Sequence, residues 1–195
     1  IVNFFTFSFF FIFLLRKLSQ HDNKKIFFIY GWLFGLGYFL SNLYWISISL
    51  TFDQNFKLLI PFTIILIPAF LAIFYGLVTF FFVILKPKNF LVSFLVFSLI
   101  FGVSEFLRGS ILTGFPWNLI AYSFSNQLQI LSITSILGTY GFNLYCISLF
   151  TCPSLLFLEN IKKKGSIVCI FFIFSLISSY IYGSSNKEKF NELLT

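Results

Sequence analysis

The sequence of 195 residues has few charged side chains, one histidine, three cysteines and no methionine. Lys, Arg, Asp and Glu make up 10% of the chain, against about 25% in a typical soluble domain. So few charges cannot cover a water-soluble globule, and a domain of this length could not bury 33 Phe side chains. The composition therefore excludes a soluble enzyme core, a disordered tail and a nucleic-acid-binding module.

The three cysteines lack the spacing of a zinc site or of a disulfide framework. Cys146, Cys152 and Cys169 all lie in apolar runs, without Lys or Glu at helical spacing. A thiolate nucleophile needs such groups nearby as acid and base. We interpret the three residues as small buried hydrophobic side chains, and we expect no catalytic residue, no metal and no cofactor in this chain.

The absence of methionine bears on how the chain begins. Residue 1 is Ile, inside an apolar run that has neither the basic segment nor the small-residue cleavage site of a signal peptide. We therefore expect the sequence to be a fragment of a longer protein whose translation start lies upstream.

What the sequence has in abundance is long apolar runs, with 58% hydrophobic residues and a mean hydropathy of +0.96. A membrane-spanning helix needs about 20 apolar residues. We predict an all-α, polytopic transmembrane helix bundle, with Pro61 and Pro68 kinking the third span. The six predicted spans are residues 1–15, 26–50, 58–85, 90–107, 128–158 and 166–182. Residues 1–182 would form the membrane domain, and residues 183–195 the start of a linker.

Basic residues are distributed unequally between alternate loops. The loops after spans one, three and five contain nine Lys and Arg, whereas the loops after spans two and four and the C-terminal tail contain four. Because basic residues in short loops are retained in the cytoplasm, the tail is predicted to lie on the outer side. The cations form short clusters rather than one face, so no nucleic-acid partner is expected.

Glycines stand out in two of the predicted spans. In the second span, Gly31 and Gly35 form a GxxxG pair, which lets a neighbouring helix approach closely. The glycines that we expect to serve helix packing are Gly31, Gly35, Gly37, Gly138 and Gly141.

Residues 104–122 differ from the other apolar segments. Glu105 and Arg108 are three residues apart on one helical face and can pair, which lowers the cost of about 2.5–3.5 kcal/mol for an isolated charge in a spanning helix. Beyond them, Gly109, Gly114 and Pro116 are expected to break helical continuity in a segment that stays apolar and aromatic. This pattern predicts a re-entrant or interfacial loop after the fourth span.

Two interpretations of this segment remain open. Glu105 and Arg108 can cap the end of the fourth span, with Trp117 as an interfacial anchor. Alternatively, the segment forms a polar notch on the outer face, in which Arg108 meets the phosphate of a phospholipid and Trp117 an acyl chain. The candidate substrate- or lipid-facing residues are Glu105, Arg108, Thr113, Gly114, Phe115, Pro116, Trp117, Asn118 and Tyr122.

The same residues resemble a known family. Residues 105–109 (Glu-Phe-Leu-Arg-Gly) and 112–117 (Leu-Thr-Gly-Phe-Pro-Trp), followed by Tyr122 and residues 138–141 (Gly-Thr-Tyr-Gly), are similar to the membrane domain of bacterial apolipoprotein N-acyltransferases. Residues 31–45 support the resemblance, which extends over nearly the whole chain in the order and spacing of the spans.

The resemblance implies a multi-pass enzyme of the bacterial inner membrane that serves lipoprotein biosynthesis. Such an enzyme transfers an acyl chain from a phospholipid donor to the N-terminal diacylglyceryl-cysteine of an apolipoprotein acceptor. In the family, a Glu, Lys and Cys triad in a periplasmic nitrilase-like domain forms the acyl-enzyme, and the resemblance places that domain after the sixth span. We therefore expect this chain to be inactive alone and to supply anchoring and lipid access.

Two other classes of protein remain as alternatives. A small transporter or channel would have its pathway marked by Glu105, Arg108, Asn42 and Asn143. Such a pathway normally needs polar groups at the midplane on several helices, whereas the charges here gather near one outer edge. The other alternative is a noncatalytic membrane scaffold.

Overall fold

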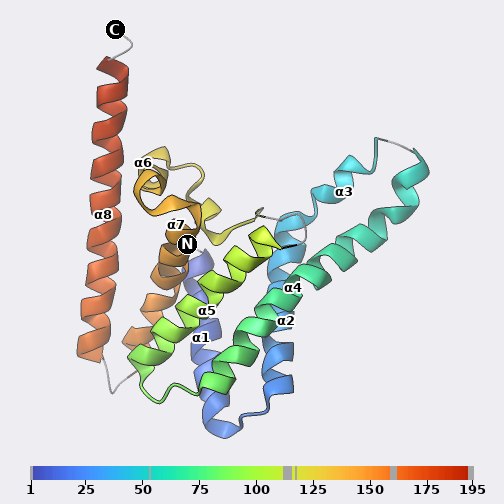
Figure 1. Ribbon diagram of the computed structural model, residues 1–195, viewed down its shortest axis with the longest axis horizontal. Helices are drawn as coiled ribbons and strands as arrows, with labels where there is room; N and C mark the ends of the chain where they lie inside the picture. Colours follow the sequence, from blue (N-terminus) through green and yellow to red (C-terminus); the bar gives the residue numbers. More distant parts are fainter. Residues whose placement is uncertain (1, 53, 112–115, 117, 159–161, 193–195) are drawn as a thin grey trace. The chain divides into compact units, whose positions relative to one another are not determined.

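The computed structural model describes residues 2–52, 54–111, 116, 118–158 and 162–192, and these contain helices but no strand. The all-α prediction is confirmed. In chain order the elements are α1 (Val2–Gln20), α2 (Lys24–Leu43), α3 (Ile46–Ser49), η1 (Gln54–Leu59), α4 (Ile60–Leu85), α5 (Phe90–Ser110), η2 (Ile120–Phe124), α6 (Leu128–Leu131), α7 (Thr134–Thr151), η3 (Cys152–Phe157) and α8 (Lys162–Glu192) (Figure 1).

Within the described residues, six helical stretches are long and apolar enough to cross a membrane, as predicted. They are Val2–Gln20, Lys24–Leu43, Lys57–Leu85, Phe90–Ser110, Thr134–Phe157 and Lys162–Lys187. Several helices end elsewhere than predicted: α1 runs beyond residue 15, and α8 continues past residue 182 to Glu192. The expected break at Gly109 is wrong, because α5 continues through this residue to Ser110. Hydropathy locates the hydrocarbon-spanning part of a helix, whereas backbone hydrogen bonding continues into polar flanks.

The fifth predicted span is not one continuous helix over residues 128–158. The structure divides it into α6, α7 and η3. Gly138 adopts a φ of 70° inside α7, a left-handed conformation that glycine tolerates and that interrupts the helical path. A Cβ on Gly138 would meet no described atom within 4 Å, so close helix packing does not require glycine here. The left-handed backbone conformation does. Pro153 follows at the start of η3, where the missing N–H is tolerated.

The chain divides into two compact units. Unit 1 comprises Ile1–Ile12, Lys88–Gly102 and Leu119–Thr195, and unit 2 comprises Phe13–Pro87 and Val103–Asn118. Helices α1 and α5 therefore contribute residues to both units.

In unit 1, α8 packs antiparallel to α7 and η3. The Tyr145 hydroxyl donates to the Phe172 carbonyl at 3.1 Å, and the Cys169 thiol donates to the Cys152 carbonyl at 3.3 Å. Phenylalanine rings fill the core of this unit. Fully buried examples are Phe7, Phe11, Phe97, Phe101 and Phe142.

In unit 2, α2 and α4 lie side by side and antiparallel (Figure 1). The Thr79 hydroxyl donates to the Phe27 carbonyl at 2.6 Å, and the Trp32 indole donates to the Ala69 carbonyl at 2.9 Å. Residue numbers thus rise along α2 as they fall along α4. These side-chain hydrogen bonds to backbone carbonyls satisfy polar groups that would otherwise be costly in an apolar environment.

The two glycines of the GxxxG pair lie in this interface. A Cβ on Gly31 would overlap the Thr79 hydroxyl and the Tyr75 carbonyl, and a Cβ on Gly35 would lie 2.9 Å from the Tyr75 Cβ. Gly37 differs, since a Cβ there would meet no described atom within 4 Å. Close approach of α4 therefore requires glycine at the first two positions but not at Gly37.

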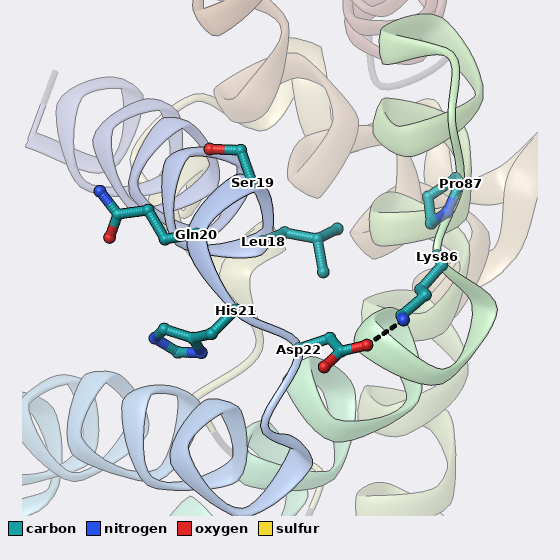
Figure 2. A pocket seen from close by; sticks show the side chains of 7 residues that line it. All are labelled: Leu18, Ser19, Gln20, His21, Asp22, Lys86 and Pro87. Atoms are coloured by element: carbon teal, nitrogen blue, oxygen red, sulfur yellow. Dashed lines mark hydrogen bonds and ion pairs between the residues drawn. The ribbon is translucent and has the colours of Figure 1, made fainter.

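The loop between α1 and α2 meets the end of α4 through an ion pair of Asp22 and Lys86, which borders a shallow pocket (Figure 2). The Lys86 ammonium stabilises the carboxylate and lowers the pKa of Asp22. Both side chains are more than half exposed, so the pair adds little stability. It places these two basic loops at the same end of unit 2, and their cytoplasmic location stays a prediction.

Replacing Gly31 with Leu should destabilise unit 2 by roughly 1–3 kcal/mol, the usual range for an overpacked interface. Gly37→Leu is the matched control, because it removes a glycine from the same helix where space is open. The free energy of unfolding in bicelles measures both. Equal stability of the two variants would contradict close α2–α4 packing at Gly31.

Candidate functional site

The centre of the candidate site is an ion pair near the C-terminal end of α5. Arg108 Nε donates to Glu105 Oε1 at 3.1 Å, and Arg108 Nη2 donates to Glu105 Oε2 at 2.8 Å. The two side chains are three residues apart on one helical face, and both have 0% exposed surface. The sequence spacing thus produces a bidentate pair, the geometry that best offsets the cost of removing two charges from water.

Aromatic rings from α2 and α4 surround this pair. The Arg108 guanidinium carbon lies 5.3 Å from the centroid of the Phe39 ring, within the range of a cation–π interaction. The Phe39 ring lies 5.1 Å from that of Tyr75, which in turn lies 5.8 Å from that of Tyr38. The guanidinium is therefore covered by an aromatic face rather than by water.

Hydrogen bonds tie α5 and the following segment to the rest of unit 2. The Ser104 hydroxyl donates to the Phe74 carbonyl of α4 at 3.0 Å. The Tyr38 hydroxyl donates to the Asn118 carbonyl at 3.2 Å. Asn118 has a φ of 60°, a left-handed conformation that Asn adopts more readily than most residues. Tyr38 thus fixes the point at which the chain leaves the segment after α5.

The structure places the predicted site residues in different parts of the molecule. Glu105, Arg108, Pro116 and Asn118 belong to unit 2, whereas Tyr122 lies on η2 in unit 1, 45% exposed. The remaining candidates lie outside the described residues, namely Thr113, Gly114, Phe115 and Trp117. The re-entrant or interfacial course of this loop stays a prediction.

The expected contact of Arg108 with a phospholipid phosphate stays a prediction. Glu105 occupies one edge of the guanidinium and Phe39 covers its face. The Arg108 side chain is fully buried near the C-terminal end of α5.

Three neighbours of the ion pair were not among the sequence candidates: Tyr38, Phe39 and Tyr75. Tyr38 and Phe39 do fall within the stretch 31–45, which the sequence marked by its glycines and aromatic residues. Tyr75 lies opposite Gly31 and Gly35, and the GxxxG pair predicts close packing there without naming the partner helix.

The three cysteines are free and buried in unit 1. The Cys152 thiol donates to the Leu149 carbonyl at 3.2 Å, and the Cys169 thiol donates to the Cys152 carbonyl. These contacts with backbone oxygens suit the structural role expected from the sequence.

The two asparagines of the transporter alternative each bond to a backbone group of their own unit. Asn143 Oδ1 accepts a hydrogen bond from the Ala121 amide at 2.9 Å, which holds η2 against α7. Asn42 Nδ2 donates to the Tyr38 carbonyl at 2.7 Å within α2. Both contacts fix backbone segments within a unit.

The helices and the buried pair define a polytopic α-helical membrane protein. A family model described as "Apolipoprotein N-acyltransferase N-terminal domain" matches residues 2–152. The chain belongs to this family, as the motifs around Glu105 and Trp117 predicted.

Individual relatives agree with the family match. The chain is 32% identical over 197 residues to an apolipoprotein N-acyltransferase of Rickettsia prowazekii, covering 97% of the chain and 38% of the relative. It is 34% identical over 142 residues to an apolipoprotein N-acyltransferase of Brucella melitensis, covering 72% of the chain and 26% of the relative. It is 37% identical over 128 residues to that of Rhodopseudomonas palustris, covering 65% of the chain and 24% of the relative. The chain thus spans between about a quarter and two fifths of these relatives.

Removing one partner of the buried pair should be strongly destabilising. Arg108→Leu and Glu105→Leu should each lose about 3–5 kcal/mol of unfolding free energy, because each removes the bidentate partner that offsets the desolvation of the other side chain. The double variant should lose less than either single variant, which denaturant unfolding in bicelles can measure. Single-variant losses below about 1 kcal/mol would instead indicate a solvated pair.

Proposed function

We propose that this chain is the membrane domain of an apolipoprotein N-acyltransferase. The complete protein would transfer an acyl chain from a phospholipid to the N-terminal diacylglyceryl-cysteine of a lipoprotein. Membership of the family supports the proposal, as does a relative of that name matched over 97% of the chain. The domain would act in the inner membrane of a bacterium, with phospholipid and apolipoprotein as its substrates.

In this proposal the chain anchors the enzyme and provides access for lipid, and the nucleophile lies elsewhere in the protein. Cys146, Cys152 and Cys169 are poor candidates for a nucleophile because all three are buried and free. Holding two lipid-linked substrates beside a separate catalytic group lowers the entropic cost of their encounter. The six membrane-competent helices found among the described residues suit the anchoring role.

The observation that carries the site proposal is the closed ion pair of Glu105 and Arg108. Two contacts hold the residues that flank the segment between α5 and η2. The Phe39 ring lies against the Arg108 guanidinium, and the Tyr38 hydroxyl donates a hydrogen bond to the Asn118 carbonyl. We place the lipid-facing surface on that segment, with Thr113, Phe115 and Trp117 as its candidate contacts. Tyr122, which is 45% exposed, is the separate lipid-facing candidate of unit 1.

The site proposal further places this segment and the C-terminal tail on the periplasmic side. The unequal loop charges support this orientation. In intact cells, a membrane-impermeant maleimide should label Lys57→Cys and Ser185→Cys, but Lys163→Cys only after permeabilisation. The native cysteines are at most 8% exposed, so background labelling should be low. Labelling of Lys163→Cys alone in intact cells would reverse the orientation.

A chimaera tests the functional proposal. Residues 1–195 replace the aligned segment of the Rickettsia prowazekii relative, and transfer of a labelled acyl chain from phospholipid to a diacylglyceryl-cysteine peptide is measured in membranes. The chimaera should be active. Trp117→Ala and Tyr38→Phe should lower turnover at least tenfold, because misplacement of a bound substrate costs up to about a hundredfold.

Leu66→Ala is the control, since this side chain on α4 is 59% exposed and lies apart from the pair. An inserted chimaera without activity would refute the acyltransferase assignment. Full activity in both the Trp117 and the Tyr38 variants would leave the assignment intact and refute the proposed lipid-facing role.

A further inference from the structure

Another candidate binding site lies on the surface of unit 2, between α2 and α4. It is an apolar groove of about 360 Å³, lined by Phe28, Ile29, Leu77 and Phe80, with Lys25 at one end. Ile29 and Leu77 are 50% and 38% exposed, so the groove is open along its length. The groove is therefore lined by hydrocarbon, to which the side chain of Lys25, in the first turn of α2, contributes.

The shape of the groove depends on Gly76 of α4. A Cβ at this position would lie 2.7 Å from Phe28 Cε2, so only glycine lets the Phe28 ring lie directly against the α4 backbone. The groove beside Leu77 and Phe80 thus results from the close packing of α2 against α4.

The charges around this end of unit 2 are strongly unbalanced. Five cations belong to the neighbouring ends of α1, α2 and α4, and they are Arg16, Lys17, Lys24, Lys25 and Lys86. Asp22 is the acidic residue of the connecting loop, and it is paired with Lys86. An occupant that suits both parts of the groove needs an apolar chain and an anionic group at one end of that chain.

We infer that this groove binds one anionic phospholipid, with an acyl chain along Phe28, Ile29, Leu77 and Phe80 and its phosphate at Lys25. A lysine stem can follow the apolar surface while its ammonium reaches the head-group region. The lining residues cover about one turn of each helix, roughly 5 Å, so they enclose the first carbons of the chain.

This site is separate from the ion pair of Glu105 and Arg108. Phe28 precedes Phe39 by eleven residues on α2, which is about 16 Å of helix. By the loop charges the groove opens to the cytoplasmic leaflet, opposite to the predicted periplasmic site. The inference therefore goes beyond the proposed function and does not depend on it.

Photocross-linking in vesicles tests the inference. The protein is reconstituted with phosphatidylglycerol or with zwitterionic phosphatidylcholine, each carrying a diazirine near the top of one acyl chain, and labelled peptides are mapped. Peptides that contain residues 25–29 and 77–80 should be labelled several-fold more by phosphatidylglycerol. Excess inorganic phosphate should not compete, because the apolar groove contributes to binding.

Two variants separate the head-group and acyl-chain contacts. Lys25→Gln should lower the preference for phosphatidylglycerol roughly fivefold, the usual contribution of one basic residue at a membrane surface. Leu77→Trp should fill the groove and lower labelling by both lipids. The matched controls are Lys163→Gln, an exposed lysine in unit 1, and Leu66→Trp, an exposed position elsewhere on α4. Neither control should change labelling.

Several results would overturn the inference. Equal labelling of these peptides by the two lipids would show ordinary contact with bulk lipid. An unchanged preference in Lys25→Gln would exclude the proposed phosphate contact. Loss of the preference on addition of inorganic phosphate would assign the cationic end to free phosphate instead of a lipid.

Discussion

The cost of holding a charge away from water dominates the organisation of unit 2. Glu105 and Arg108 have fully buried side chains, so each is tolerable only with the other in bidentate contact. This requirement fixes the rotamers of both residues, and the guanidinium carbon lies 5.3 Å from the centroid of the Phe39 ring. The end of α5 is thereby held at a defined position, from which the segment leading to Asn118 departs.

Helix packing at a distance from the pair makes this arrangement possible. Gly31 and Gly35 allow α4 to approach α2 so closely that Tyr75 lies among the rings of α2. Tyr38 then connects α2 to the far end of the segment through the Asn118 carbonyl. The two glycines thus determine where the aromatic rings of α2 and α4 lie, and these rings pack around the ion pair. The same packing, continued to Gly76, shapes the apolar groove near Lys25.

The sequence predicted the helical class, the six spans and the pairing of Glu105 with Arg108, because apolar run length and helical spacing are local properties. The family was also recognisable, since an intramembrane charge pair followed by Thr-Gly-Phe-Pro-Trp is a specific combination. The break at Gly138 was missed because hydropathy does not register backbone conformation. Tyr75 and Phe39 were missed because their roles arise from which helices meet. The burial of Arg108 likewise depends on the packing of α2, and spacing within α5 could not predict it.

Bidentate pairing of Glu105 with Arg108, away from the surface, is the contact on which the rest of unit 2 depends. Isotope-edited infrared spectroscopy of the protein with a labelled Glu105 carboxyl measures this contact directly. The Glu105 band should shift in Arg108→Leu and stay unchanged in Leu66→Ala, whose side chain is exposed on α4. A Glu105 band that is unchanged by loss of Arg108 would contradict the bidentate pair.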